Sequence, residues 1–152
     1  MSEAVDADSV KSLMTVKVET IESKESLKQA LRKMVKRNIG SIVVVEGASP
    51  VGILTERDIS RYVARGTSGL KTQVKRLMSG PLITIASSAT TQEAITTMLK
   101  HGVRRLPVVE KGKLIGIVSQ RDLLRWVLRV TNEPIISSEL REILERQPLS
   151  KP

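Results

Sequence analysis

Residues 52–58 read GILTERD and residues 116–122 read GIVSQRD, so one seven-residue pattern occurs twice at an offset of 64 positions. The similarity extends in both directions without a gap. Of the 56 residue pairs that run from Val10 and Val74 to Arg65 and Arg129, 20 are identical. Self-similarity at a constant offset is the signature of a duplicated structural unit. The chain therefore contains two copies of one fold.

Each copy is predicted to have the order strand, helix, strand, strand, helix. A hydroxyl residue followed three positions later by Gln or Glu predicts the start of the first helix, because the two side chains can satisfy free N–H groups at its end. β-Branched runs joined by a short polar connection then predict a hairpin. The predicted helix starts are Ser26, Asp58, Thr90 and Asp122, and the predicted hairpins span residues 42–55 and 106–119.

A three-stranded sheet with both helices on one face leaves its other apolar face uncovered, and a unit of roughly 60 residues is only marginally stable alone. We therefore expect the copies to pack sheet against sheet about a pseudo-two-fold axis, in an α/β (α+β) fold with two clefts. The predicted divisions are an N-terminal extension at 1–9, the copies at 10–66 and 67–130, and a tail at 131–152 with a short helix at 138–146.

The composition excludes several classes of protein. The chain has no Cys and one His, which argues against disulfides, metal sites and a Ser/His/Asp catalytic set. The N-terminal residues are acidic and no apolar run approaches the length of a membrane span, so we expect a cytoplasmic, non-membrane protein. We expect no enzyme and no catalytic cofactor.

The net charge of +9 calls for an anionic partner. Residues 1–69 contribute +2 and residues 70–152 contribute +7, so the excess belongs to the second copy and the tail. A nucleic-acid-binding or scaffold protein with vestigial clefts is therefore an alternative function. A high content of charged residues and the lack of Cys are also typical of proteins from thermophiles. The net charge can therefore indicate either an anionic partner or a thermophilic source.

The repeated pattern resembles a known family. Two motifs of the form G-I-[LV]-[TS]-x-R-D, with RLPVV at 105–109 before the second, look like a tandem of CBS domains, a Bateman module, over roughly residues 10–130. The resemblance implies a regulatory sensor that binds an adenosine compound such as AMP, ADP, ATP or S-adenosylmethionine, with AMP the expected ligand. It also implies action on a separate effector protein.

The resemblance places the ligand's ribose at Thr55 and Asp58 in the first copy, and at Ser119 and Asp122 in the second. The chemistry is suitable, because a carboxylate can accept both vicinal ribose hydroxyls and a helix N-terminus favours phosphate charge. The alternative is that these residues only cap a helix, as Ser, Thr and Asp often do.

The resemblance also implies that each cleft combines residues of both copies. The Asp58 cleft would take its base wall from Ile83 and Val103, with Arg104 and Arg105 as phosphate ligands. Solvated surface arginines are the alternative for this pair. The remaining predicted contacts are Glu19, Ile39, Gly40 and Ser41 for the base wall of the Asp122 cleft, and Arg57 and Arg121 as supplementary phosphate ligands or surface charges.

The second helix of each copy predicts an oligomer. Ile59 and Tyr62 in the first copy, with Leu123 and Trp126 in the second, give these helices apolar faces that could meet those of another chain. Bateman modules commonly pair in this way, so the resemblance also implies a homodimer.

Overall fold

The computed structural model describes residues 8–66 and 69–130, and it has the predicted α/β fold with the predicted element order in each copy. The predicted tail helix at 138–146 lies outside these residues. No helix in the described part of the chain is long and apolar enough to cross a lipid bilayer. The elements of the first copy are α1 (Val10–Leu13), β1 (Thr20–Glu22), α2 (Leu27–Arg37), β2 (Ser41–Glu46), β3 (Ser49–Thr55) and α3 (Glu56–Ala64).

The second copy repeats this order, with a single 3-10 turn in place of the first short helix. Its elements are η1 (Val74–Arg76), β4 (Ile85–Ala86), α4 (Thr91–His101), β5 (Arg105–Glu110), β6 (Lys113–Ser119) and α5 (Gln120–Val130). Each copy forms a three-stranded sheet in the order β1-β2-β3 or β4-β5-β6. The first strand pairs in parallel with the second, and the second pairs antiparallel with the third.

The helix starts follow the local sequence. Ser26 and Thr90 form the predicted capping boxes, and left-handed residues at Asn38 and Gly102 end α2 and α4. The prediction that the second helices begin at Asp58 and Asp122 was wrong by two residues. Helix α3 begins at Glu56 and α5 at Gln120, because Thr55 is the N-cap of α3 and Asp58 closes its capping box as the third helical residue.

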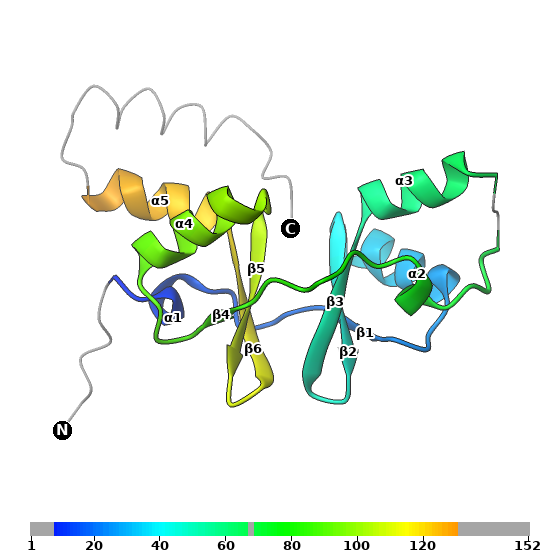
Figure 1. Ribbon diagram of the computed structural model, residues 1–152, viewed down its shortest axis with the longest axis horizontal. Helices are drawn as coiled ribbons and strands as arrows, with labels where there is room; N and C mark the ends of the chain where they lie inside the picture. Colours follow the sequence, from blue (N-terminus) through cyan, green and yellow to red (C-terminus); the bar gives the residue numbers. More distant parts are fainter. Residues whose placement is uncertain (1–7, 67–68, 131–152) are drawn as a thin grey trace.

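The two sheets meet in the middle of the molecule, with the helices on the outside (Figure 1). Val43 and Val45 of β2 pack with Ile117 of β6 in a small core between the copies. At the edge of this contact, the backbone N–H of Leu114 donates to the carbonyl of Ala48 over 3.0 Å. The expected packing of sheet against sheet is therefore present.

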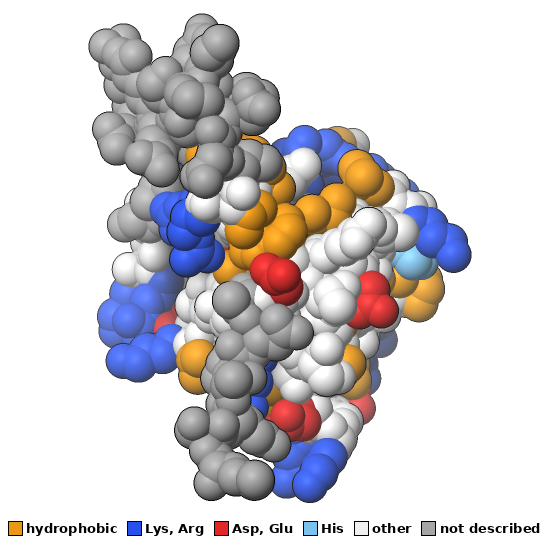
Figure 2. Space-filling view, turned by 90° about the vertical axis from the view of Figure 1, so that its left-hand side faces the viewer, with side chains coloured by type: hydrophobic (Ala, Val, Ile, Leu, Met, Phe, Trp, Pro, Cys, Tyr) orange, Lys and Arg blue, Asp and Glu red, His pale blue; other side chains and the backbone are white. Residues whose placement is uncertain are grey.

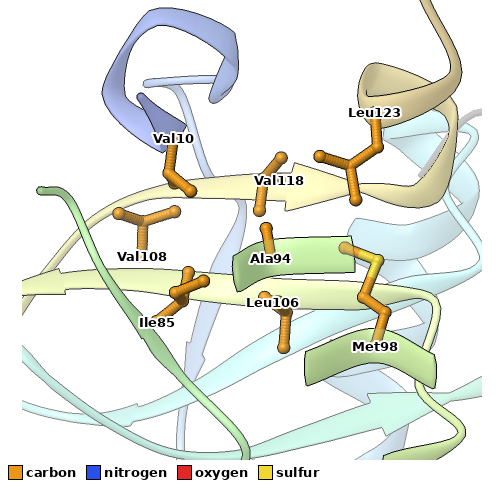
Figure 3. Close-up of a cluster of buried hydrophobic side chains, with 8 residues drawn as sticks. All are labelled: Val10, Ile85, Ala94, Met98, Leu106, Val108, Val118 and Leu123. Atoms are coloured by element: carbon orange, nitrogen blue, oxygen red, sulfur yellow. The ribbon is translucent and has the colours of Figure 1, made fainter. Parts of the chain in front are cut away.

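The connections cross between the copies. Helix α1 precedes β1 in the chain but lies beside α4 and α5, as Figure 1 shows. Its Val10 is 0% exposed and packs among residues of the second copy such as Ala94 and Leu106 (Figure 3). In the same way, Val74 of η1 is buried in the core of the first copy. The packed units therefore differ from the sequence copies, because the first segment of each copy packs against the core of the other copy. We call the segment from α1 to β1, and the segment from η1 to β4, the crossing segments.

The apolar side chains predicted to form an oligomer contact also make contacts within the chain. Ile59 and Tyr62 pack against the core of the first copy, and Leu123 is buried in that of the second. Trp126 uses its indole N–H to donate to Asp8 over 3.1 Å. Leu123 is therefore not available to another chain, whereas Ile59, Tyr62 and Trp126 are half-buried, and the homodimer stays a prediction.

Each third strand has a glycine, Gly52 in β3 and Gly116 in β6, where a crossing segment lies close to the strand backbone. A Cβ atom at Gly116 would lie 2.5 Å from Sδ of Met14 and 3.1 Å from the carbonyl oxygen of Thr15. We expect Gly116→Ala to lower the free energy of unfolding by about 1–3 kcal/mol, the usual cost of overpacking. Urea denaturation measures this change. If the clash is the cause, the double variant Gly116→Ala with Met14→Ala should lose less free energy of unfolding than the two single variants added together. Simple additivity of the two losses would contradict this explanation.

Candidate functional site

The end of β3 and the start of α3 hold Thr55 and Asp58 in fixed contact. Oδ2 of Asp58 accepts hydrogen bonds from the backbone N–H and the hydroxyl of Thr55, both over 2.8 Å. The backbone N–H of Asp58 donates to Oγ1 of Thr55 over 3.3 Å. The Asp58 side chain is buried, with 8% of the residue exposed. The capping role proposed as the alternative is therefore real, and any ligand contact would be additional to it.

Ser79, which lies between η1 and β4 of the second copy, completes this arrangement. Its hydroxyl donates to Oδ1 of Asp58, while its backbone N–H donates to the carbonyl of Ile53 over 3.1 Å. Sequence reasoning did not identify Ser79. The available signal was that both copies carry a hydroxyl residue directly after the repeated Met, as Thr15 and Ser79.

The equivalent junction of β6 and α5 is more open. Oδ2 of Asp122 accepts hydrogen bonds from the backbone N–H and the hydroxyl of Ser119, both over 2.8 Å. Within residues 8–66 and 69–130, the structure has no hydrogen bond to Oδ1 of Asp122. Asp122 is also half-buried, whereas Asp58 is buried. The two predicted ribose sites therefore differ in the state of their carboxylates.

The four predicted phosphate ligands have different environments. Arg57 and Arg104 are exposed, and Arg105 and Arg121 are half-buried. The Nε atom of Arg105 is buried, and within residues 8–66 and 69–130 it has no hydrogen-bond partner. Burial lowers the pKa of Arg105 from its ordinary value, and the charges of Arg104 and Arg121 lower that pKa further, while Glu56 opposes them. Arg105 is thus a partly desolvated cation among other cations.

The charge of Glu56, in the first copy, raises the pKa of Arg105, in the second copy. Glu56 is the first residue of α3 in the first copy, and Arg105 is the first residue of β5 in the second. A carboxylate two residues before Asp58 is therefore close enough to Arg105 to act on its pKa. That the Asp58 site faces the start of β5 in the other copy stays a prediction.

The predicted base-wall residues mostly belong to the surroundings of the two cores. Ile39 packs half-buried against the first core, and Ile83 and Val103 pack against the second. Glu19 forms an ion pair with Arg37, with 2.8 Å between Oε1 and Nε. The other two positions are Gly40, whose carbonyl accepts from the backbone N–H of Glu56 over 3.0 Å, and Ser41, which pairs with Thr55 across the hairpin.

Comparisons with known proteins agree with this architecture. The family model of the CBS domain matches residues 10–65 and 74–129. The chain is 37% identical over 126 residues to the CBS domain-containing protein YhcV of Bacillus subtilis, a match that covers 82% of this chain and 88% of YhcV.

Two solved structures show the same fold. A CBS domain protein, NE2398, is 34% identical with a TM-score of 0.73, covering 80% of this chain and 98% of the other. The CBS domain pair of MJ0100, solved in complex with 5′-methylthioadenosine and S-adenosylmethionine, is 26% identical with a TM-score of 0.70, covering 78% and 94%. With two matched copies and the same arrangement of strands and helices, this chain belongs to the CBS-domain family as a tandem pair of CBS domains.

Proposed function

We propose that this CBS pair is a regulatory module that binds an adenosine-containing ligand, with AMP as the expected compound. On binding, the module would change its contacts with a separate effector protein. The complex of the MJ0100 pair with two adenosine compounds supports the ligand class. The hydrogen-bonded Asp residues at both strand–helix junctions support a site for a sugar diol.

The environment of Arg105 carries this proposal furthest. Buried polar groups in folded proteins are nearly always hydrogen-bonded, so a buried Nε without a partner in the described part of the chain calls for an explanation. Nearby Arg104 and Arg121 make the charged guanidinium still less favourable. A bound phosphate would supply both the missing acceptor and the opposing charge, and guanidinium groups match phosphate oxygens well.

The first test compares adenosine with AMP. We expect AMP to bind more tightly, and we expect the double change Arg104→Ala with Arg105→Ala to remove most of that difference while adenosine affinity stays nearly constant. The reason is that only the phosphate needs the cations. Isothermal titration calorimetry measures both affinities. Arg32→Ala with Lys36→Ala is the matched control, because it removes the same charge from two exposed positions on α2.

Equal affinity for adenosine and AMP in the unmodified protein would contradict the phosphate assignment, as would an unchanged AMP affinity in the double variant. Titration with duplex DNA addresses the alternative function that the net charge of +9 favours. Binding of DNA at moderate salt, with no binding of adenosine compounds, would select the nucleic-acid alternative. That binding should weaken steeply with added salt, because phosphate contacts release counterions.

We also propose that the protein forms a homodimer through the outer surfaces of its helices. Val35 on α2 and Leu99 on α4 are equivalent positions and are 78% and 75% exposed, and Val63 and Leu124 are exposed on α3 and α5. Figure 2 shows hydrophobic side chains gathered in a band between groups of Lys and Arg on the end formed by the second copy. Exposed apolar patches often mark contact surfaces.

Light scattering tests the oligomeric state directly. At micromolar concentration we expect a mass of twice the 16.7 kDa of one chain. We expect Val35→Glu with Leu99→Glu, or Val63→Glu with Leu124→Glu, to shift the mass toward that of a single chain, because a charge buried at an interface without a partner is unfavourable. A single-chain mass for the unmodified protein would contradict the proposal.

A further inference from the structure

The two junction carboxylates occupy equivalent positions but have different numbers of hydrogen bonds. An ionised carboxylate offers about four acceptor positions on its two oxygens. In Asp58, three donors already use these positions: two groups of Thr55 and the hydroxyl of Ser79. In Asp122, the described residues supply two donors, both from Ser119. Asp58 therefore has about one acceptor position left and Asp122 about two.

The difference between the two carboxylates comes from the crossing segments, which contain Thr15 in the first copy and Ser79 in the second. Thr15, which corresponds to Ser79, pairs with Ile117 through two backbone hydrogen bonds of 2.8 and 3.0 Å, and no side-chain hydrogen bond of Thr15 occurs among the described residues. Ser79 pairs with Ile53 through its backbone N–H and places its hydroxyl on Asp58. The crossing segment with Ser79 therefore donates a hydrogen bond to Asp58. Among the described residues, the crossing segment with Thr15 donates none to Asp122.

We infer that Ser79 determines the affinity of the Asp58 site for a sugar diol, by competing with one ligand hydroxyl for Oδ1. This inference rests on the proposed function. A vicinal diol brings two donors, so at Asp122 both can bind, while at Asp58 one has to displace Ser79. Exchanging one hydrogen bond for another yields little net free energy. The Asp122 site is therefore the tighter site for the sugar, and the Asp58 site depends more on its arginines.

The experiment removes the competing hydroxyl in a chain with one working site. In the Asp122→Ala background, we expect Ser79→Ala to tighten adenosine binding about tenfold, the usual size of a hydrogen bond to a charged group. Adenosine is the probe because it lacks the phosphate that the arginines would bind. Calorimetric titration gives the affinity of the Asp58 site directly.

Three controls separate competition from a structural effect. Thr15→Ala, the equivalent change in the other connection, should leave adenosine affinity unchanged in the same background. Ser79→Thr should retain the original affinity, because it keeps a hydroxyl. With 2′-deoxyadenosine, which lacks one of the two hydroxyls, the gain from Ser79→Ala should largely disappear. A general change in packing would affect both ligands alike.

The possible results separate this inference from the function on which it rests. If adenosine binds the unmodified protein but Ser79→Ala leaves its affinity unchanged or weakens it, Ser79 does not compete and the inference fails, while the proposed function stands. Equal gains for adenosine and 2′-deoxyadenosine would also overturn it. If neither the unmodified protein nor any variant binds adenosine or AMP, the proposed function fails, and the inference fails with it.

Discussion

Replacing Asp122 with Ala is expected to weaken the binding of an adenosine compound at its site by about 1.5–3 kcal/mol, the range for hydrogen bonds to a charged group. Asp58→Ala is expected to have an effect at the lower end of this range at its own site, because one ligand hydroxyl there only replaces the hydroxyl of Ser79. In each case the ligand loses a carboxylate that can accept from its ribose hydroxyls. Titration of both variants with AMP should show one site lost in each.

Both carboxylates also stabilise a helix start, so stability has to be separated from binding. Loss of a capping side chain costs about 0.5–2 kcal/mol. Glu93→Ala is the matched control, because Oε2 of Glu93 accepts from the backbone N–H of Thr90 over 2.7 Å in a capping box without a proposed ligand site. We expect this variant to lose stability and retain affinity. If Asp58→Ala and Asp122→Ala behave like Glu93→Ala, the two carboxylates are helix caps only.

A fragment of residues 8–66 is expected to be unfolded in isolation, although it contains one whole sequence copy. Its core would lack Val74, Leu77 and Met78, which come from the other copy. Burial of one valine such as Val74 contributes about 1.5–3 kcal/mol, which is a large share of the stability of a small unit. The fragment would also expose Val10, which is buried in the second copy.

Circular dichroism and denaturant titration measure this expectation. The control is a fragment of residues 18–79, which has a similar length but carries the segment that covers its own core. We expect greater helical content and a sharper unfolding transition for residues 18–79, and recovery of structure when fragments 8–66 and 69–130 are mixed. A cooperative transition in residues 8–66 alone would contradict the idea that the crossing segments hold the units together.

The local sequence determined a large part of this fold. The duplication, the element order and the capping boxes at Ser26 and Thr90 could be predicted, because each depends on residues close together in the chain. The contact between Thr55 and Asp58 is equally local, and the same i to i+3 spacing forms in both copies. The one local error, the start of α3 and α5, arose because the cap residue lies before the Asp that closes its box.

Only the tertiary structure decided how the two sites differ. Ser79 lies 21 positions from Asp58, and the hydrogen bond between them depends on the path of a connecting segment over the other copy. Tertiary structure also places Val10 in the second core and brings Oγ1 of Thr72 to 2.8 Å from the hydroxyl of Tyr62. Periodicity reports which face of an element is apolar, but not which segment covers that face. The burial of Arg105 likewise depends on what surrounds it in space, and a sequence pattern carries no information about that.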